Sequence, residues 1–393
     1  MNRPRYELAG IIDEFLSEIL TKRLLTSHQL STLDALHKCR TESMGGHVEE
    51  CEDCGQQQIV YNSCRNRHCP KCGSIDREKW LLAREADLLP VRYFHVVFTL
   101  PEALNNLCLH YPQDMYKILF HVVWDVLKTF GKDKKWIGCQ LGMTCLLHTW
   151  GQNLSLHPHL HCIVPAGGIT NKAKWKHSRN RGKFLFRVEH LSNVYRARFV
   201  ASLRDWAKEK KIHIQQQLFD KLFEKDWVVD ARQPFGGPKQ VLKYLGRYTN
   251  RIAITNYRIL SIKDGIVTFS YKDYEDNEKI KSMPLRGKEF LRRFTMHIFP
   301  YRFIRIRHYG FLSSRNKSKL LVVARHSLKA KPPCYKELSW HEIVELRWGI
   351  KPLVCHKCKG KMSITQTIQQ QRAPPVWYDI KPNTKFYQQK QTA

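Results

Sequence analysis

The stretch at residues 157–161 carries the side chains best suited to metal chemistry, with histidine at positions 157, 159 and 161. Side chains alternate along an extended strand, so His159 and His161 share one face. Two imidazoles placed this way can converge on one divalent ion whose open coordination positions accept a substrate phosphate. His148 becomes the third ligand if the preceding strand pairs with this one, and Gln240 is the competing candidate. For an isolated pair of strand histidines, the plainer interpretation is a hairpin with histidines on its surface or in its core.

Two tyrosines downstream have the spacing of paired nucleophiles on a helix. Residues 236–251 open with two glycines and a proline, which suits a first helical turn, and Tyr244 and Tyr248 then lie on one face. A phenol alone is a poor nucleophile, but beside a divalent cation and an arginine it can attack phosphorus and form a 5′-phosphotyrosine. A pair permits two successive cleavages, or cleavage followed by strand transfer. The alternative is burial, because Val241 extends the pair into an apolar stripe.

A segment rich in cysteine and histidine between residues 39 and 72 indicates structural zinc. It contains two C-x-x-C pairs, and each such turn lets two thiolates face one ion. Its eight donors can hold two ions, or one ion with spare ligands, and so small a segment could scarcely fold without metal. The predicted zinc ligands are Cys39, Cys51, Cys54, Cys64, His68, Cys69 and Cys72. A further pair, Cys355 and Cys358, is a weaker indication of a metal site near the C-terminus.

The charge balance predicts a polyanionic partner. Lys and Arg number 66 against 35 Asp and Glu, which gives a formal net charge of +31. A surplus of that size repels itself unless a polyanion such as nucleic acid binds it. Arg65, Arg67 and Lys71, beside the predicted zinc ligands, suggest that the zinc module contacts DNA, the alternative being a basic but solvated surface.

The composition also excludes other classes of protein. Hydrophobic residues at 42% and aromatic residues at 11% are typical of a globular chain and not of a disordered one. No apolar run approaches the roughly 18–20 residues of a membrane span, and no signal peptide is visible. The 13 cysteines are therefore expected in a reducing compartment, and we expect a cytoplasmic, nucleoid-associated protein.

Hydrophobic periodicity predicts an α+β fold whose central, largely antiparallel sheet is flanked by helices. The expected helices lie at 6–36 (one or two), 76–89, 111–130, 190–210 and 238–249, and the expected strands at 93–100, 142–150, 159–164, 227–230 and 257–271. Residues 171–183 are predicted to form a loop, and the glutamine-rich end after Cys358 to be disordered. We expect a helical and zinc-binding DNA-recognition domain (1–90), a domain that carries the chemistry (91–330) and a C-terminal extension (331–393).

Together these motifs resemble the two-tyrosine transposases of the insertion-sequence 91 family, in the HUH superfamily. The likeness runs from about residue 33 to about residue 358 and includes the cysteine module, the histidine stretch, residues 244–256 (YLGRYTNRIAITN) and residues 290–294 (FLRRF). The combination is much more specific than the histidine motif alone. One departure is Asn250, which adjoins the tyrosines where His would be expected in many relatives.

The resemblance implies rolling-circle, or more generally single-strand, DNA transposition by an HUH endonuclease domain that uses Mg²⁺ or Mn²⁺. It also implies that the zinc module helps to recognise the ends of the element. It makes His159 and His161 the metal ligands and Tyr244 and Tyr248 the nucleophiles. Beside the resemblance, we predict His148 as the third ligand and Arg247, Arg251 and Trp150 as DNA contacts, the last by stacking on a base. The order of the motifs agrees, because the histidines precede the tyrosines as they do in replication initiators and transposases.

Three other functions fit parts of the pattern. A rolling-circle replication initiator uses the same chemistry and differs only in its DNA context. A non-catalytic zinc-dependent nucleic-acid binder predicts binding without metal-dependent nicking. A tyrosine recombinase, suggested by residues 305–309, needs no metal, so inhibition by a chelator would exclude it. An enzyme with three catalytic carboxylates is disfavoured because acidic residues are sparse.

Overall fold

The structure is a computed structural model that describes residues 4–21, 25–179, 183–235, 237, 240, 241, 246, 252–274, 276–332 and 337–370. The predicted nucleophiles Tyr244 and Tyr248 lie outside the described residues, and so do the predicted DNA contacts Arg247 and Arg251. The histidine stretch and the predicted zinc ligands are all described.

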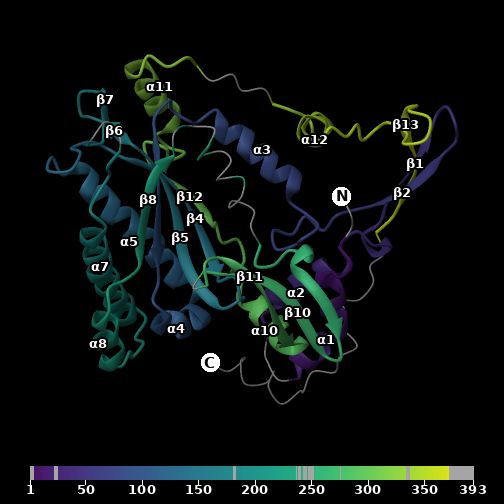
Figure 1. The fold of residues 1–393 in the computed structure, drawn as a ribbon, viewed down its shortest axis with the longest axis horizontal. Coiled ribbons are helices and arrows are strands. Elements are labelled where there is room, and N and C mark those ends of the chain that lie inside the picture. Colours follow the sequence, from purple (N-terminus) through teal and green to yellow (C-terminus); the bar gives the residue numbers. More distant parts are fainter. Residues whose placement is uncertain are drawn as a thin grey trace.

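A five-stranded sheet forms the centre of the molecule, in the order β12-β4-β5-β3-β8 (Figure 1). Every neighbouring pair in this sheet is antiparallel. The strands are β3 (Tyr93–Thr99), β4 (Gly142–Trp150), β5 (Leu156–Pro165), β8 (Val229–Phe235) and β12 (Ile306–Gly310). The predicted α+β class and the predicted antiparallel sheet are therefore confirmed.

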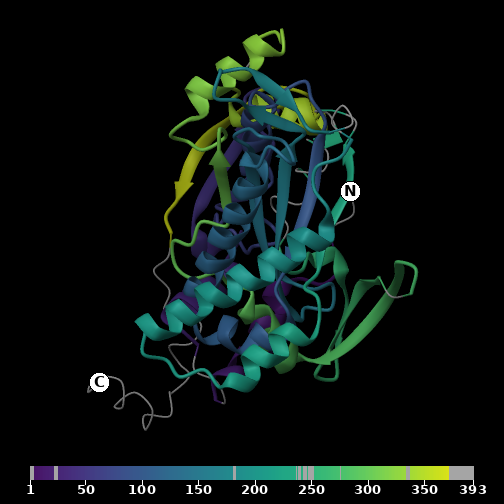
Figure 2. The same cartoon turned by 90° about the vertical axis from the view of Figure 1, so that its left-hand side faces the viewer.

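One face of the central sheet is apolar and is covered by two long helices, α5 (Pro112–Lys132) and α7 (Val188–Glu209). Phe98 on β3 meets Tyr195 of α7 edge to face at 5.2 Å, and Tyr309 on β12 stacks on Trp124 of α5 at 5.3 Å. From the side shown in Figure 2, α7 crosses in front of the sheet. This packing buries one face of the sheet and leaves the histidines on the other.

The opposite face carries the histidines and is covered in part by α3 (Ser74–Glu85). Leu81 of α3 packs in one cluster with Tyr93 and Ile163 of the sheet and with the buried Val241. Val241 belongs to the segment predicted to carry the tyrosines. Val241 therefore lies on the histidine face of the sheet.

A second body packs beside the central sheet, where the N-terminal helices α1 (Leu8–Leu20) and α2 (Ser27–His37) meet α10 (Gly287–Met296). The contact between α1 and α10 is so close that a Cβ on Gly287 would overlap the ring of Phe15. A sheet in the order β11-β10-β9 completes this body. Its strands are β9 (Ile259–Lys263), β10 (Ile266–Asp273) and β11 (Lys279–Arg286).

A third sheet, β13-β1-β2, joins the two ends of the chain. Its strands are β1 (Gly46–Cys51), β2 (Gln57–Tyr61) and β13 (Met362–Ile368), and the sheet lies at one end of the molecule, at the right of Figure 1. The prediction of disorder after Cys358 is wrong for residues 362–368, because hydrogen bonds to β1 order this polar segment. Local composition could not reveal a partner strand more than 300 residues away.

The remaining elements connect these bodies. They are α4 (Asn105–His110), α8 (Gln216–Glu224), α11 (Lys317–Ser327), α12 (Trp340–Trp348), β6 (Gly167–Ile169) and β7 (Trp175–His177). The prediction of a loop over 171–183 is wrong at β7, which pairs with β6. No helix among the described residues is long and apolar enough to cross a membrane.

Candidate metal centre and its surroundings

Three histidines converge on the polar face of the central sheet, and we call His148, His159 and His161 the histidine site. His148 on β4 lies directly opposite His159 on β5, so the strand pairing brings together the three residues that the sequence singled out. One ring nitrogen of each lies within 4.8 Å of the others. The Nε2 atoms of His159 and His161 are 3.1 Å apart. Two ligands at right angles on an ion with bonds of about 2.1 Å would be separated by about 3.0 Å, so the geometry fits a divalent ion.

A hydrogen bond on the far side of the His159 ring fixes its tautomer. The Nδ1 of His159 donates to the carbonyl oxygen of His157 at 2.6 Å, which leaves its Nε2 lone pair for a ligand. The Nδ1 of His161 is hydrogen-bonded to Nε2 of His95 at 2.9 Å, and these two rings stack at 5.2 Å. The Nε2 atoms of His159 and His161 face each other, so they can share a proton or, when both are deprotonated, direct their lone pairs to one cation.

Burial keeps the imidazole of His159 neutral. It lowers the pKa of His159 to about 4. An imidazole must be deprotonated to coordinate a metal, so His159 is ready to bind at neutral pH without losing a proton first.

Trp150 holds His148 in place. Its indole stacks on the His148 ring at 4.7 Å with an angle of 22° between the planes, and only 9% of Trp150 is exposed. His297 packs against the indole at 6.1 Å and is itself held by the carbonyl oxygen of Leu154. A base could not reach the face of Trp150 in this arrangement. Its observed contacts support a positioning role for the predicted stacking residue.

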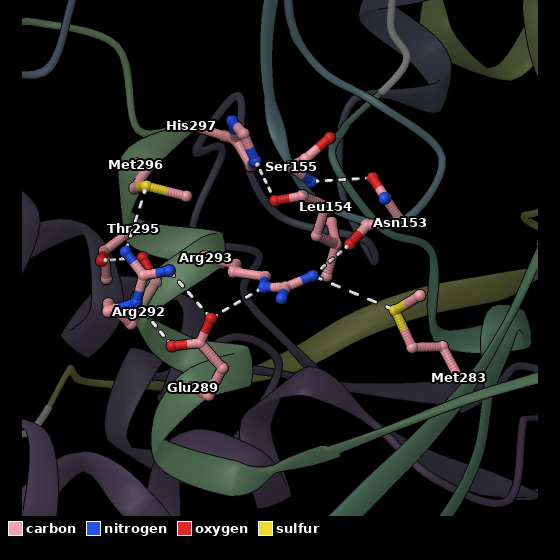
Figure 3. A network of polar contacts seen from close by, with 10 residues as sticks. All are labelled: Asn153, Leu154, Ser155, Met283, Glu289, Arg292, Arg293, Thr295, Met296 and His297. Carbon is pink, nitrogen blue, oxygen red and sulfur yellow. Dashed lines mark hydrogen bonds and ion pairs between the residues drawn. The ribbon is translucent and has the colours of Figure 1, made fainter. Parts of the chain in front are cut away.

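A cavity of about 440 Å³ opens beside the histidine site, between the β4–β5 connection and α10. Its lining includes His157, two residues before His159, and the side chains of Arg292 and Arg293. Figure 3 shows how these arginines are held: both bind Glu289, and Nη1 of Arg293 also donates to the carbonyl oxygen of Asn153 at 3.1 Å. Hydrogen bonds from Arg292 hold the pKa of Glu289 at about 2. The cavity wall thus presents two arginines, both paired with Glu289, and one carboxylate, Glu102.

Two residues near the histidine site, His95 and Asp230, were not identified by sequence analysis. His95 lies on β3 and binds His161, and Asp230 on β8 faces Val97, the residue opposite His161 on β3. The alternation along residues 93–99 could have placed His95 on one face. Whether His95 lies on the same face of the sheet as His159 and His161 depends on how β3 pairs with β5. Periodicity within one strand does not give the register of that pairing.

Replacing His95 with alanine is expected to weaken Mn²⁺ binding about 10–100-fold, because the partner that orients His161 is lost. Isothermal titration of the purified protein with Mn²⁺ measures this change. The exposed His177 provides the control, since His177→Ala removes a histidine from β7 without touching the site. Equal Mn²⁺ affinity in the two variants would show that His95 does not support the metal centre.

Four of the predicted zinc ligands form one group, the N-terminal thiol site, which consists of Cys39, Cys64, Cys69 and Cys72. The sulfur of Cys72 lies 3.4 Å from that of Cys39 and 3.7 Å from that of Cys64. A tetrahedral zinc with Zn–S bonds of about 2.3 Å separates its sulfurs by about 3.8 Å, so the four thiols are close to ligand spacing. Hydrogen bonds from Cys64 and Cys69 lower the pKa of the Cys39 thiol to about 7, while hydrogen bonds to Cys39 raise the pKa of Cys64 and of Cys69.

The other predicted zinc ligands lie elsewhere. His68 is buried and its Nε2 accepts a hydrogen bond from the backbone N–H of Phe299 at 3.4 Å, outside the thiol group. Burial lowers the pKa of His68 well below its usual value. Cys51 and Cys54 form a separate group with Cys355 and Cys358.

The basic residues beside the zinc ligands divide into two kinds. Arg67 donates to the carbonyl oxygen of Phe303 at 2.6 Å, and Lys71 pairs with Glu7 at 2.8 Å. These two contacts tie the zinc module to the rest of the protein. Arg65 is exposed, with its backbone in the left-handed region at φ 51°.

Comparison with known proteins gives the family. Residues 142–319 match the family model described as "Putative transposase", and residues 11–100 match the model described as "Transposase zinc-binding domain". The chain is 38% identical over 372 residues to "Putative transposase y4qJ" of Sinorhizobium fredii, covering 90% of this chain and 93% of the relative. It is 26% identical over 372 residues to "Transposase for insertion sequence element IS801" of Pseudomonas savastanoi pv. phaseolicola, covering 90% and 87%. No solved structure matches the chain.

These matches settle the class to which the molecule belongs. The matched zinc-binding domain and the thiol groups together support structural Zn²⁺, and a transposase has DNA as its partner. The chain belongs to the insertion-sequence 91 family of transposases and carries the family's N-terminal zinc-binding domain.

Proposed function

We propose that this transposase nicks and rejoins single-stranded DNA at the ends of an insertion sequence through a 5′-phosphotyrosine intermediate. The observation that carries the proposal is the histidine site, in which the Nε2 atoms of His159 and His161 face each other at 3.1 Å. In the proposal His148, His159 and His161 would hold Mg²⁺ or Mn²⁺ on this face of the sheet. Such an ion would supply positive charge to the scissile phosphate.

The protein's own residues contribute binding and orientation. Arg292 and Arg293 line the cavity next to His157, where they can receive the phosphates of a single strand. His95 and Trp150 hold the rings of His161 and His148. Because these contacts fix the positions of the side chains, the phosphate would meet a preorganised site.

The tyrosines would supply the nucleophile. The two described positions nearest to them, Val241 and Gly246, both lie against Leu81 of α3, and a Cβ on Gly246 would stand 3.2 Å from the Leu81 side chain. In the proposed step the phenolic oxygen of Tyr244 or Tyr248 forms a bond to phosphorus while the bond from phosphorus to the 3′ oxygen breaks. The proton leaves the phenol, and the departing 3′ oxygen gains one to become a hydroxyl.

Rejoining reverses this exchange. A 3′-hydroxyl attacks the phosphotyrosine and releases the phenol, so each phosphodiester bond lost is replaced by another of similar energy. The second tyrosine can cut a second site before the first DNA end is released. This provides strand transfer without hydrolysis.

A direct test incubates the protein with labelled oligonucleotides from the flanks of its gene and separates the products on denaturing gels. We expect a covalent protein–DNA adduct with single strands and Mn²⁺, none with duplex DNA, and none in the Tyr244→Phe, Tyr248→Phe double variant. Tyr301→Phe, which changes an exposed tyrosine, should keep full activity. Nicking without an adduct, or an adduct that persists in the double variant, would refute the proposal.

A further inference from the structure

A second group of four thiols among the described residues brings together distant parts of the chain. Cys51 and Cys54 flank the turn after β1, and Cys355 and Cys358 precede β13. The sulfur of Cys51 lies 3.4 Å from that of Cys358, and the sulfur of Cys54 lies 3.8 Å from that of Cys355. All four sulfurs are within 4.8 Å of one another, close to the spacing of about 3.8 Å around a tetrahedral zinc.

The two turns have the same backbone hydrogen bonds, although more than 300 residues separate them. In the first, the N–H of Gly55 donates to the carbonyl of Cys51, and the N–H of Cys51 donates to the carbonyl of Gln56. In the second, the same two bonds run from Lys359 to Cys355 and from Cys355 to Gly360. Each turn thus presents its two sulfurs in the same way.

A left-handed residue follows the second cysteine of each turn. It is Gly55 at φ 66° in the first turn and Lys359 at φ 69° in the second, and Gly73 takes φ 80° after Cys72 of the N-terminal thiol site. Lysine adopts this conformation at a cost that glycine avoids. In the second turn, backbone N–H groups of Lys357 and Gly360 also donate to the sulfurs of Cys355 and Cys358, at 3.4 Å each. Such donors stabilise thiolates and leave the remaining lone pairs for an ion.

The surrounding contacts hold the two turns in register. Strand β13 pairs with β1, and Cys51 is directly opposite Met362. Lys361 pairs with Glu52 at 2.7 Å, and a Cβ on Gly360 would overlap the carboxylate of Asp53. At the other end of this segment, Arg347 of α12 pairs with Glu78 of α3 at 3.0 Å. These contacts bury little apolar surface, since the hydrophobic cluster between the two turns consists only of Cys51, Cys355 and Met362 among the described residues.

We propose that Cys51, Cys54, Cys355 and Cys358, the shared thiol site, bind a second structural zinc ion that joins the two ends of the chain. The zinc-binding domain matched over residues 11–100 supplies two of these ligands and cannot complete the site by itself. Because the N-terminal thiol site has its own four thiolates, the two ions are held independently. The C-terminal segment is therefore a required part of the zinc-binding module.

Metal analysis of the purified full-length chain tests this inference. Inductively coupled plasma mass spectrometry should find two zinc ions per chain in the unmodified protein. The Cys355→Ser, Cys358→Ser variant should hold one, and so should the Cys51→Ser, Cys54→Ser variant. A variant with all four substitutions should also hold one, because both pairs bind the same ion. His356→Ala changes an exposed side chain in the same turn and should keep two.

Cobalt substitution, combined with circular dichroism, distinguishes the loss of metal ligands from a loss of metal caused by misfolding. Tetrathiolate Co²⁺ absorbs visible light, and each double variant should show about half the absorbance of the unmodified protein while keeping its far-ultraviolet circular dichroism. Two zinc ions in the Cys355→Ser, Cys358→Ser variant would overturn the inference. So would one zinc in the unmodified protein, or the loss of both ions in the fourfold variant while the fold is kept.

Discussion

His161→Ala is expected to reduce metal-dependent DNA cleavage by on the order of 10³-fold, because removing a ligand sacrifices several kcal/mol of charge stabilisation at the phosphate. In the proposal His161 would contribute a ligand nitrogen beside that of His159, and its ring contacts His95. Single-turnover cleavage rates with Mn²⁺ measure the effect.

Two comparisons separate this loss from a loss of folding or of DNA binding. His121→Ala changes an exposed histidine on α5 and should cleave at the normal rate. The His161→Ala protein should still bind single-stranded DNA within about three-fold of the normal affinity, since the basic surface that attracts phosphates is unchanged. A His161→Ala protein that cleaves at the normal rate would remove the histidine site from the mechanism.

Cys69→Ser is expected to cost the protein the zinc of its N-terminal thiol site and much of its stability. Zinc sites of small domains supply about 10–16 kcal/mol of folding free energy, and Cys69 is only 2% exposed within the core beside Cys39. We expect the content of zinc to fall by one ion per chain and the thermal unfolding temperature to drop by more than 10 °C, or about 3–5 kcal/mol.

The matched control for this change is Cys139→Ser. Cys139 is also buried, at 5% exposure, but belongs to no group of thiols among the described residues. It should keep its zinc and lose only about 1 kcal/mol, the cost of placing a hydroxyl in an apolar site. If Cys69→Ser unfolded at the same temperature as the unmodified protein, the thiol group would have no structural role.

The features that could be predicted from the sequence are those that depend on residues close together in the chain. Strand alternation placed His159 and His161 on one face, and His148 was expected beside them if the two strands paired, as they do. Helical periodicity located α1, α5 and α7 because each carries an apolar stripe along its own length. These features depend on neighbours a few residues apart, and their patterns can be read locally.

The features that the sequence could not give depend on distant partners. His95 joins the histidine site through the register between β3 and β5, which periodicity leaves open. Trp150 was expected to meet DNA, but its ring is covered by His148 and His297. The pair Cys355 and Cys358 was by itself only a weak indication of a metal site. In the structure its sulfurs lie beside those of Cys51 and Cys54, from the other end of the chain.

The central claim is that a tyrosine of this protein becomes joined to DNA, and mass spectrometry of the trapped complex tests it most directly. The complex formed with single-stranded DNA and Mn²⁺ would be digested with nuclease and protease, and its nucleotide-bearing peptide sequenced. The account predicts a 5′-phosphonucleotide on Tyr244 or Tyr248. Modification of another residue, or cleaved DNA with a free 5′-phosphate and no modified peptide, would contradict it.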